Sequence, residues 1–291
     1  MVEWINTILQ GLLVGGLYAL LATGLALSFG IMRIVNIAHG DFAVLAAYAA
    51  MVIVEPFGLH PLATLLIIVP AMAAFGYALQ RYVLNRTVGH DIMPPLLATF
   101  GLSIIVQNLL LSVFSADTRS LRAGTLATDS LALGGQVAVG VLPLLEMSAA
   151  AAVIGSLWWL FRRTPVGGAM RATSDDPETV QLMGVDNHRI HALAMAMAMA
   201  AVAVGGIFLA MHTSLGPSDG SLRLLYAFEA VIIGGLGSLW GAMAGGMVLG
   251  VAQAIGHKLD PGWGTLAGHL AFLAVLVLRP DGLFPVRRSM R

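Results

Sequence analysis

The chain has 291 residues, of which 58% are hydrophobic and 10% charged, with a mean hydropathy of +0.87, a formal net charge of zero and no cysteine. Soluble domains carry about 25% charged residues, so this composition indicates an integral membrane protein. It excludes a disulfide framework and a cysteine-ligated metal site, and it gives no electrostatic case for binding nucleic acid.

Eight predominantly apolar stretches are candidate membrane spans, where a full span needs about 20 residues. They are Ile5–Ile31, Ile37–Val54, Pro61–Gln80, Met93–Ser115, Val137–Phe161, Ile190–His212, Phe228–Gly256 and Thr265–Leu278. The N-terminus, MVEW, lacks the basic region of a signal peptide, so the first stretch is expected to be a retained span. We predict an all-α, polytopic fold of about eight segments, some broken or re-entrant, forming one transmembrane domain over residues 1–291.

Arginines set the predicted orientation, because loops rich in Lys and Arg stay in the cytoplasm. The loops expected there carry Arg33, Arg81, Arg86, the stretch Arg162 to Arg189, Arg279, Arg287, Arg288 and Arg291. The loops carrying Arg119, Arg122 and Arg223 would lie outside. Six simple spans from an external N-terminus satisfy this pattern as far as Ser221.

The seventh stretch, Phe228–Gly256, conflicts with that orientation if it crosses once, because the C-terminal arginines would then lie outside. The conflict disappears if the stretch is a hairpin that enters and leaves on the same side, broken at GGLGSLWG (Gly234–Gly241). Non-helical backbone at membrane depth is tolerated where it is buried in protein or lines a cavity. The alternative is one long span with an extra half-span elsewhere.

Polar residues follow the first span in RIVNIAHGDF, where Asn36, His39, Gly40 and Asp41 are grouped. Ionisable groups at this depth are expensive and usually face a cavity or a partner chain, which favours a discontinuous helix lining a path. The alternative is an ordinary cytoplasmic turn in which Asn36 and Asp41 cap the neighbouring helices. His39 and Asp41 alone would not complete a metal coordination sphere.

Other polar residues within the spans have simpler explanations. Gln107 and Asn108 lie in the middle of the fourth span and would face a pore or bond to a neighbouring helix. Glu146 and Glu229 lie near external span ends, where interface exposure is expected. His212 and His269 receive no role. GxxxG-like pairs such as Gly11–Gly15 and Gly246–Gly250 indicate close helix crossing, within the chain or with a second subunit.

The stretch from Arg162 to His191 is the only long polar segment, and it contains a short helix with both ends marked. Asp175 or Asp176 can serve as its N-cap, Pro177 suits the first helical position, and Glu178 lies at the positive end of the dipole. Gly184 would stop the helix. Because a helix of about two turns is unstable alone, it should pack on its own domain or on a partner.

Four segments together resemble one family, the branched-chain amino-acid ABC transporter permeases. The first is Gln10–Phe42, with a Gly-rich helix followed by an Asn-x-Ala-His-Gly turn; the second is GGAMRATSDDPETVQLMGVDNHRI (Gly167–Ile190). The others are the Gly-rich Ala227–Gly250 and the tail LRPDGLFP (Leu278–Pro285). They occur in the family's order along the whole chain, and the dipeptide Asp175-Asp176 is a departure towards a more acidic loop.

The resemblance implies an inner-membrane permease subunit that works with a second permease, two ATPase subunits and a periplasmic binding protein. A phosphate-binding loop is absent, since the only lysine, Lys258, follows His257, so ATP and Mg²⁺ would be held by the ATPase subunits. HExxH and GxSxG are absent too, and we expect no catalytic residue, metal ligand or cofactor in this chain.

The loop at 162–190 would then be the ATPase-coupling element, with Val180 and Met183 as an apolar anchor and Leu182 beside them. The coupling residues expected are Arg171, Asp176, Pro177, Glu178, Val180, Leu182, Met183 and Gly184. The substrate path would run between the two permeases. Its expected lining or gating residues are Asn36, His39, Gly40, Gly101, Gln107, Gly234, Gly235 and Ser238, with helix packing as the alternative for each.

Branched-chain or other hydrophobic amino acids are the expected cargo, and urea or short amides are the alternative within the same family. A stand-alone secondary transporter or channel for a small polar solute is the competing class. It would need an ion site inside the membrane, whereas the sequence predicts that the acids cluster at span ends. An intramembrane enzyme has no recognisable nucleophile or metal set.

Overall fold

The computed structural model describes residues 1–88, 93–133 and 137–285. Seven helices in these ranges are long and apolar enough to cross a membrane, and Gly264–Leu278 is a shorter apolar helix. The helices are α1 (Val2–Met32), α2 (His39–Phe57), α3 (Leu65–Tyr82), α4 (Met93–Phe114), α5 (Val141–Arg163), α6 (Pro165–Asp175), α7 (Pro177–Leu182), α8 (Asn187–His212), α9 (Gly220–Gly234), α10 (Leu239–Leu259) and α11 (Gly264–Leu278). The predicted all-α polytopic fold is confirmed.

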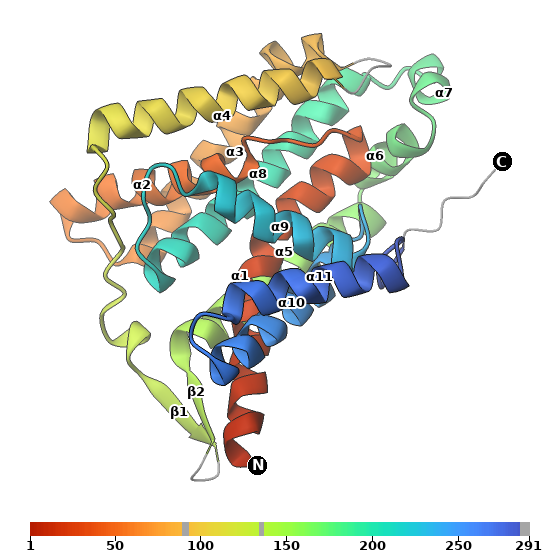
Figure 1. Ribbon diagram of the computed structural model, residues 1–291. Coiled ribbons are helices and arrows are strands. Elements are labelled where there is room, and N and C mark those ends of the chain that lie inside the picture. The colour runs from red at the N-terminus through yellow and green to blue at the C-terminus, as the bar shows by residue number, and fades with distance from the viewer. Residues whose placement is uncertain (89–92, 134–136, 286–291) are drawn as a thin grey trace.

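Helix α1 passes through the middle of the molecule and packs on α10, α8 and α5 (Figure 1). The crossing of α1 and α10 depends on the predicted GxxxG-like pairs. A Cβ atom at Gly15 would lie 2.6 Å from the Cα of Met247, and one at Gly250 would lie 2.3 Å from the carbonyl oxygen of Gly11. These glycines therefore let two backbones touch within this chain, which the sequence alone left open.

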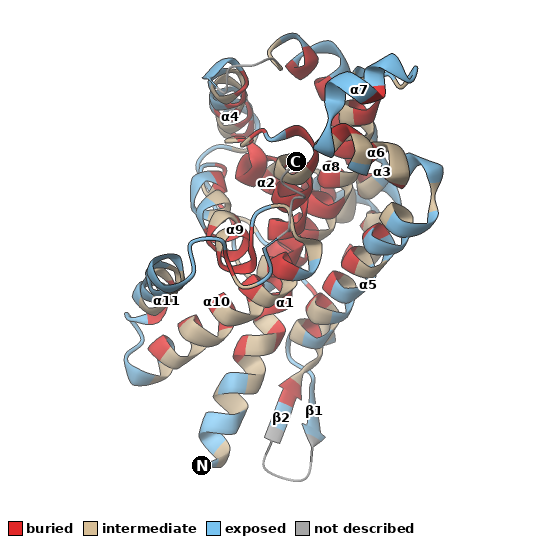
Figure 2. Cartoon of the chain, turned by 90° about the vertical axis from the view of Figure 1, so that its right-hand side faces the viewer, coloured by how far each residue is buried: buried red, intermediate tan, exposed pale blue. Residues whose placement is uncertain are grey.

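Buried residues concentrate on α1, α2, α8 and α9, whereas α4 and α11 are largely exposed (Figure 2). Of the 22 residues of α4, only Pro95, Thr99, Ser103, Val106 and Leu110 are buried. They follow one another at intervals of three or four residues, so they form one narrow stripe along the helix. The remaining surface of α4 is apolar and suits contact with lipid or with another membrane subunit.

The predicted break in the seventh stretch is confirmed. Helix α9 ends at Gly234, α10 begins after Ser238, and Gly235 and Gly237 take φ values of 107° and 83° that other residues rarely adopt. A Cβ atom at Gly234 would lie 1.9 Å from the carbonyl oxygen of Gly241, so the two helix ends meet backbone to backbone. Arg223, expected in an external loop, instead belongs to the first turn of α9.

Different loops gather at the two ends of the bundle. At one end Lys258 pairs with Glu3 at 3.3 Å, and the hairpin of β1 (Ser130–Leu133) and β2 (Val137–Gly140) lies beside the N-terminus (Figure 1). At the other end the Ser174 hydroxyl donates to the carbonyl of Gly30 at 2.5 Å. The Phe284 N–H donates there to the carbonyl of Gly234. Arg287, Arg288 and Arg291 lie outside the described residues.

The fifth span and the polar segment after it also differ from the sequence prediction. The fifth span begins at Val141 rather than Val137, because residues 137–140 pair with 130–133 as an antiparallel ladder. The polar segment contains a second helix, α6, which precedes α7. Thr164 caps α6 by accepting a hydrogen bond from the Gly167 N–H at 3.1 Å, and Pro165 occupies its first position, a start signal that the sequence also carries.

Candidate functional site

Residues 33–38 form a non-helical segment that turns back into the bundle after α1. The His39 Nε2 atom lies 2.8 Å from the carbonyl oxygen of Leu21, which precedes the end of α1 by eleven residues, or about 16 Å along the helix. Helix α2 therefore begins inside the bundle, level with Leu21 and not with the end of α1. This geometry favours the discontinuous helix over the cytoplasmic turn, and we call residues 33–38 the re-entrant segment.

Helix α9 begins at the same place. A Cβ atom at Gly40 would lie 1.9 Å from the carbonyl oxygen of Gly220, and one at Gly220 would lie 1.9 Å from the Asp41 Oδ1 atom. The first turns of α2 and α9 are thus in backbone contact around the carboxyl group of Asp41. Each helix N-terminus carries about half a positive charge, so both helix ends favour negative charge at this position and act against the cost of burying it.

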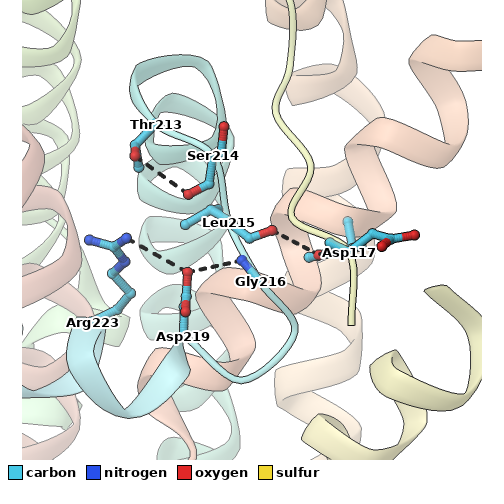
Figure 3. Close-up of polar contacts among 8 residues, drawn as sticks. Asp117, Thr213, Ser214, Leu215, Gly216, Asp219 and Arg223 are labelled. Atoms are coloured by element: carbon cyan, nitrogen blue, oxygen red, sulfur yellow. Dashed lines mark hydrogen bonds and ion pairs between the residues drawn. The ribbon is translucent and has the colours of Figure 1, made fainter. Parts of the chain in front are cut away.

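The loop between α8 and α9 holds the start of α9 in position (Figure 3). The Asp219 carboxylate accepts a hydrogen bond from the Gly216 N–H at 2.9 Å and lies 4.0 Å from the Arg223 guanidinium. The hydroxyl of Tyr48, in α2, donates to the carbonyls of Leu215 at 2.8 Å and Asp117 at 3.2 Å. Tyr48 is fully buried, so this loop is tied firmly to α2.

Helix α4 meets the re-entrant segment and α2 through polar contacts. The Ile37 N–H donates to the Thr99 hydroxyl at 3.2 Å, and the Gln107 amide donates to the Asp41 Oδ1 atom at 2.9 Å and to the Ser103 hydroxyl at 3.2 Å. We call these five residues the polar seam. Thr99, Ser103 and Gln107 are spaced by four residues, which places them on one face of a helix. This spacing is a sequence signal for the seam, although of the three only Gln107 is a predicted path residue.

The predicted path residues separate into two groups. Asn36, His39 and Gly40 are buried near Gln107 at the start of α2. Gly101 lies nearby on α4 with no atom within 4 Å of the position of a Cβ. The second group lies at the other end of α9, about 15 residues of helix away.

In that second group, Gly234 and Gly235 shape the turn between α9 and α10, and the Ser238 hydroxyl caps α10 by accepting from the Gly241 N–H at 3.0 Å. A side chain at Gly235 would also meet the carbonyl oxygen of Phe284 at 2.9 Å. Packing accounts for these three positions. A cavity of about 320 Å³ nevertheless opens beside them, lined in part by Gly237.

The predicted coupling helix is present as α7. Asp176 is its N-cap, accepting hydrogen bonds from the Thr179 N–H at 3.1 Å and the Thr179 hydroxyl at 2.6 Å, and Pro177 is its first residue. These bonds hold the pKa of the Asp176 carboxyl below its ordinary value. Gly184 follows the helix with φ 87°, which confirms the predicted stop.

The predicted apolar anchor needs one correction. Val180 is buried within this chain, with 7% of its surface exposed, so it packs α7 onto its own domain and is not free to contact a partner. Leu182 and Met183 are 89% and 79% exposed. Glu178 is also exposed, whereas Arg171 donates to the carbonyl of Phe161 and so connects α6 to the end of α5.

The expected interface exposure of Glu146 and Glu229 is wrong. Glu146 is fully buried and lies 3.0 Å from His212, and Glu229, 2% exposed, is hydrogen-bonded to His269. The two histidine side chains, for which the sequence indicates no role, are each 33% exposed. Pairing explains the burial, because a lone carboxylate would be too costly there. Each acid lies far from its histidine along the chain, so spacing could not reveal the pairs.

Comparison with known proteins places this architecture among transport proteins. A family model described as branched-chain amino acid transport system / permease component matches residues 7–277. The high-affinity branched-chain amino acid transport system permease protein BraD of Pseudomonas aeruginosa is 30% identical, over 97% of this chain and 95% of its own length.

Two further relatives have similar coverage. The high-affinity branched-chain amino acid transport system permease protein LivH of Salmonella typhimurium is 26% identical over 96% of this chain and 95% of its own length. The probable branched-chain amino acid transport permease protein LivH of Methanocaldococcus jannaschii is 25% identical over 95% and 91%, respectively. The similarity therefore extends over nearly the whole bundle, including the re-entrant segment and α7.

Proposed function

This chain belongs to the family of branched-chain amino acid transport system permease components, and on that premise we propose that it carries branched-chain or other hydrophobic amino acids into the cytoplasm as the permease subunit of an ATP-driven importer. It is a multi-pass protein of the bacterial inner membrane. The relatives are named as permease proteins of branched-chain amino acid systems, which supports this cargo over urea or short amides.

The exposed end of α7 is the observation that carries the coupling role. Leu182 and Met183 present two large apolar side chains to solvent, 89% and 79% exposed, at the end where the arginine pattern places the cytoplasm. Capping by Asp176 and the buried contact of Val180 keep the short helix formed without a partner. A preformed helix with an exposed apolar tip is suited to insertion into a groove of another protein.

The partners proposed are a second permease subunit, two ATPase subunits and a periplasmic substrate-binding protein. ATP and Mg²⁺ would be bound by the ATPase subunits, and Leu182 and Met183 would enter a groove on one of them. Asp176 and Glu178, both exposed, would face basic residues beside that groove. The cargo path would lie between the two permeases, next to the start of α2.

Reconstitution tests the proposal. The chain, its partner permease and the ATPase subunits are placed in proteoliposomes with the binding protein, and uptake of labelled leucine, isoleucine and valine is compared with uptake of urea and acetamide. ATP-dependent uptake of the amino acids alone is expected. Uptake of urea or acetamide in their place would reassign the cargo, and uptake without ATP would refute the importer role.

A stand-alone secondary transporter is the second candidate, because the structure buries three acids that such a protein could use. Asp41, Glu146 and Glu229 are at most 2% exposed, contrary to the expectation that the acids cluster at accessible span ends. Intramembrane acids commonly mark ion pathways. The chain alone in proteoliposomes, with an imposed proton or sodium gradient, would accumulate leucine under this mechanism and would show none under the importer mechanism.

A further inference from the structure

The polar seam is an unusual way to hold a helix inside a membrane. Helix α4 is apolar over most of its surface, yet its buried stripe bears Thr99, which contacts the re-entrant segment, and Ser103, which with Gln107 contacts the first turn of α2 at Asp41. An apolar stripe would suffice for packing, since helices in membranes associate through close van der Waals contact. A hydrogen bond, unlike an apolar contact, can pass to a new partner, and the backbone group that makes it then stays satisfied within the membrane.

Two polar groups, Asn36 next to the seam and Asp41 within it, suggest what a ligand would bind. The Asn36 side chain is fully buried, and its Nδ2 atom has no acceptor within the described part of the chain, while its Oδ1 atom accepts from the Ala38 N–H at 3.1 Å. Asp41 is 1% exposed, and no described Lys, Arg or His side chain lies within 4.0 Å of its carboxylate. Buried polar groups are nearly always paired, so the Asn36 amide points to a ligand or water that completes it, whereas Asp41 is hydrogen-bonded to Gln107 but has no cationic partner among the described residues.

The required ligand chemistry follows from these groups. Asp41 accepts hydrogen bonds from a cation, and Asn36 Nδ2 and the Ile37 N–H donate to an anion. A zwitterion offers a cation to the first set and an anion to the second. The head group of a free amino acid has this form, whereas urea offers only neutral groups.

We propose, on the basis of the proposed function, that the polar seam opens during transport and that the zwitterionic head group of the amino acid replaces α4 in its hydrogen bonds. The ammonium group takes the place of the Gln107 amide on Asp41, and the carboxylate takes the place of the Thr99 hydroxyl on the Ile37 N–H and engages Asn36. The apolar side chain of the cargo then lies against α4. Separation of α4 from α2 is the gating movement.

Cysteine labelling in nanodiscs tests the opening of the seam, because the chain has no cysteine of its own. Val106 is buried on the same stripe of α4 but is not one of the seam residues, and its neighbour Ile105 is 61% exposed on the outer face. In Val106→Cys, leucine-loaded binding protein with ATP should raise the labelling rate by a charged methanethiosulfonate reagent about tenfold or more. Ile105→Cys is the control and should show no such rise. A Val106→Cys rate that does not rise overturns the gating movement.

The charge of the reagent tests the role of Asp41. During turnover a cationic reagent should label Val106→Cys faster than an anionic one of the same size, and Asp41→Asn should remove that preference. An unchanged preference in Asp41→Asn overturns the assignment of the ammonium group to Asp41, as does the absence of any preference in the parent.

Uptake in proteoliposomes completes the test. Gln107→Leu and Asp41→Asn should lower leucine uptake about tenfold or more, the range for losing a hydrogen bond to a charge, while the complex still assembles. Asn108→Leu is the matched control, because Asn108 is exposed and donates to Ile104 of its own helix at 2.8 Å. Normal uptake by both seam variants refutes the proposal. If the parent complex itself shows no ATP-driven uptake, the proposed function fails instead, and the labelling result still decides whether the seam opens.

Discussion

Two regions of the chain differ in how completely they are covered. One is the contact between α1 and α10, and the other is the exposed tip of α7. In the first, glycines such as Gly15 and Gly246 bring two backbones together so closely that a Cβ atom at Gly246 would lie 2.5 Å from the Gly15 carbonyl oxygen. In the second, Leu182 and Met183 extend into solvent. The first region is complete within the chain, whereas the second leaves two large apolar side chains uncovered, which under the proposed function an ATPase subunit would cover.

This difference predicts which variants fail to fold and which variants fold but lose activity. Substitution in the packed centre must move backbone and should prevent assembly. Substitution at the tip of α7 should leave the fold intact and affect only what the tip contacts. Four predictions test the distinction, beginning with the largest expected effect.

Gly245→Leu should prevent stable folding. A Cβ atom there would lie 1.9 Å from the carbonyl oxygen of Ala230, and backbone cannot yield as a side chain can, so the cost is expected to exceed about 3 kcal/mol. Detergent-solubilised protein should be aggregated by size-exclusion chromatography. Gly101→Leu is the matched control, because nothing lies within 4 Å of its Cβ position, and it should remain monodisperse. Aggregation of both would show that apolar bulk, rather than backbone contact, is responsible.

His212→Leu should lower the melting temperature, because it leaves the buried Glu146 without its partner at 3.0 Å. Breaking a fully buried pair costs about 3–5 kcal/mol, and the partial exposure of His212 reduces this to about 1–3 kcal/mol. The double variant Glu146→Leu/His212→Leu should recover most of the loss. A double variant that is no more stable than His212→Leu would show that the cost comes from lost histidine packing.

Met183→Asp should leave the melting temperature unchanged and uncouple ATP hydrolysis from uptake. Met183 is 79% exposed, so the chain loses little packing, while a carboxylate would have to be buried in the proposed ATPase groove. The ratio of leucine transported to ATP hydrolysed measures the effect in proteoliposomes. Leu131→Asp, at the opposite end of the bundle and 52% exposed, is the control. Normal coupling in Met183→Asp would contradict the proposed contact.

The smallest effect is expected at the N-cap of α7. Asp176→Ala removes the bonds to Thr179 and should reduce coupling only a few-fold, since Val180 still anchors the helix. The pKa of Asp176 is lowered in the folded protein, so its stabilisation is present above the ordinary pKa of about 3.9 and is lost as pH falls through the lower folded value. Titration of Asp176 should therefore not affect coupling near pH 7. A pH dependence of coupling near pH 7 that Asp176→Ala abolishes would contradict this.

The sequence by itself determined the class of the protein and its segmentation. An apolar run of membrane length is not stable when exposed to water, and a backbone break that needs a positive φ favours glycine. Caps such as Asp176 and Pro177 act on residues within a few positions of themselves. The break after Gly234 and the stop at Gly184 were predictable for that reason. Arginine counts similarly separated the two ends of the bundle.

Tertiary structure alone decided which distant residues meet. From the sequence alone, Gly15 could pack on a second subunit, Val180 could contact one, and Glu146 could lie at the membrane interface. Residue type and spacing are compatible with these arrangements as well as with the observed ones. In the bundle Gly15 meets Gly246, α7 packs on α6 and α8, and Glu146 pairs with His212. Asp41 is the clearest example, because its carboxylate lies between the N-termini of α2 and α9, which only the fold brings together. Periodicity reports which face of a helix is buried, but not what covers it.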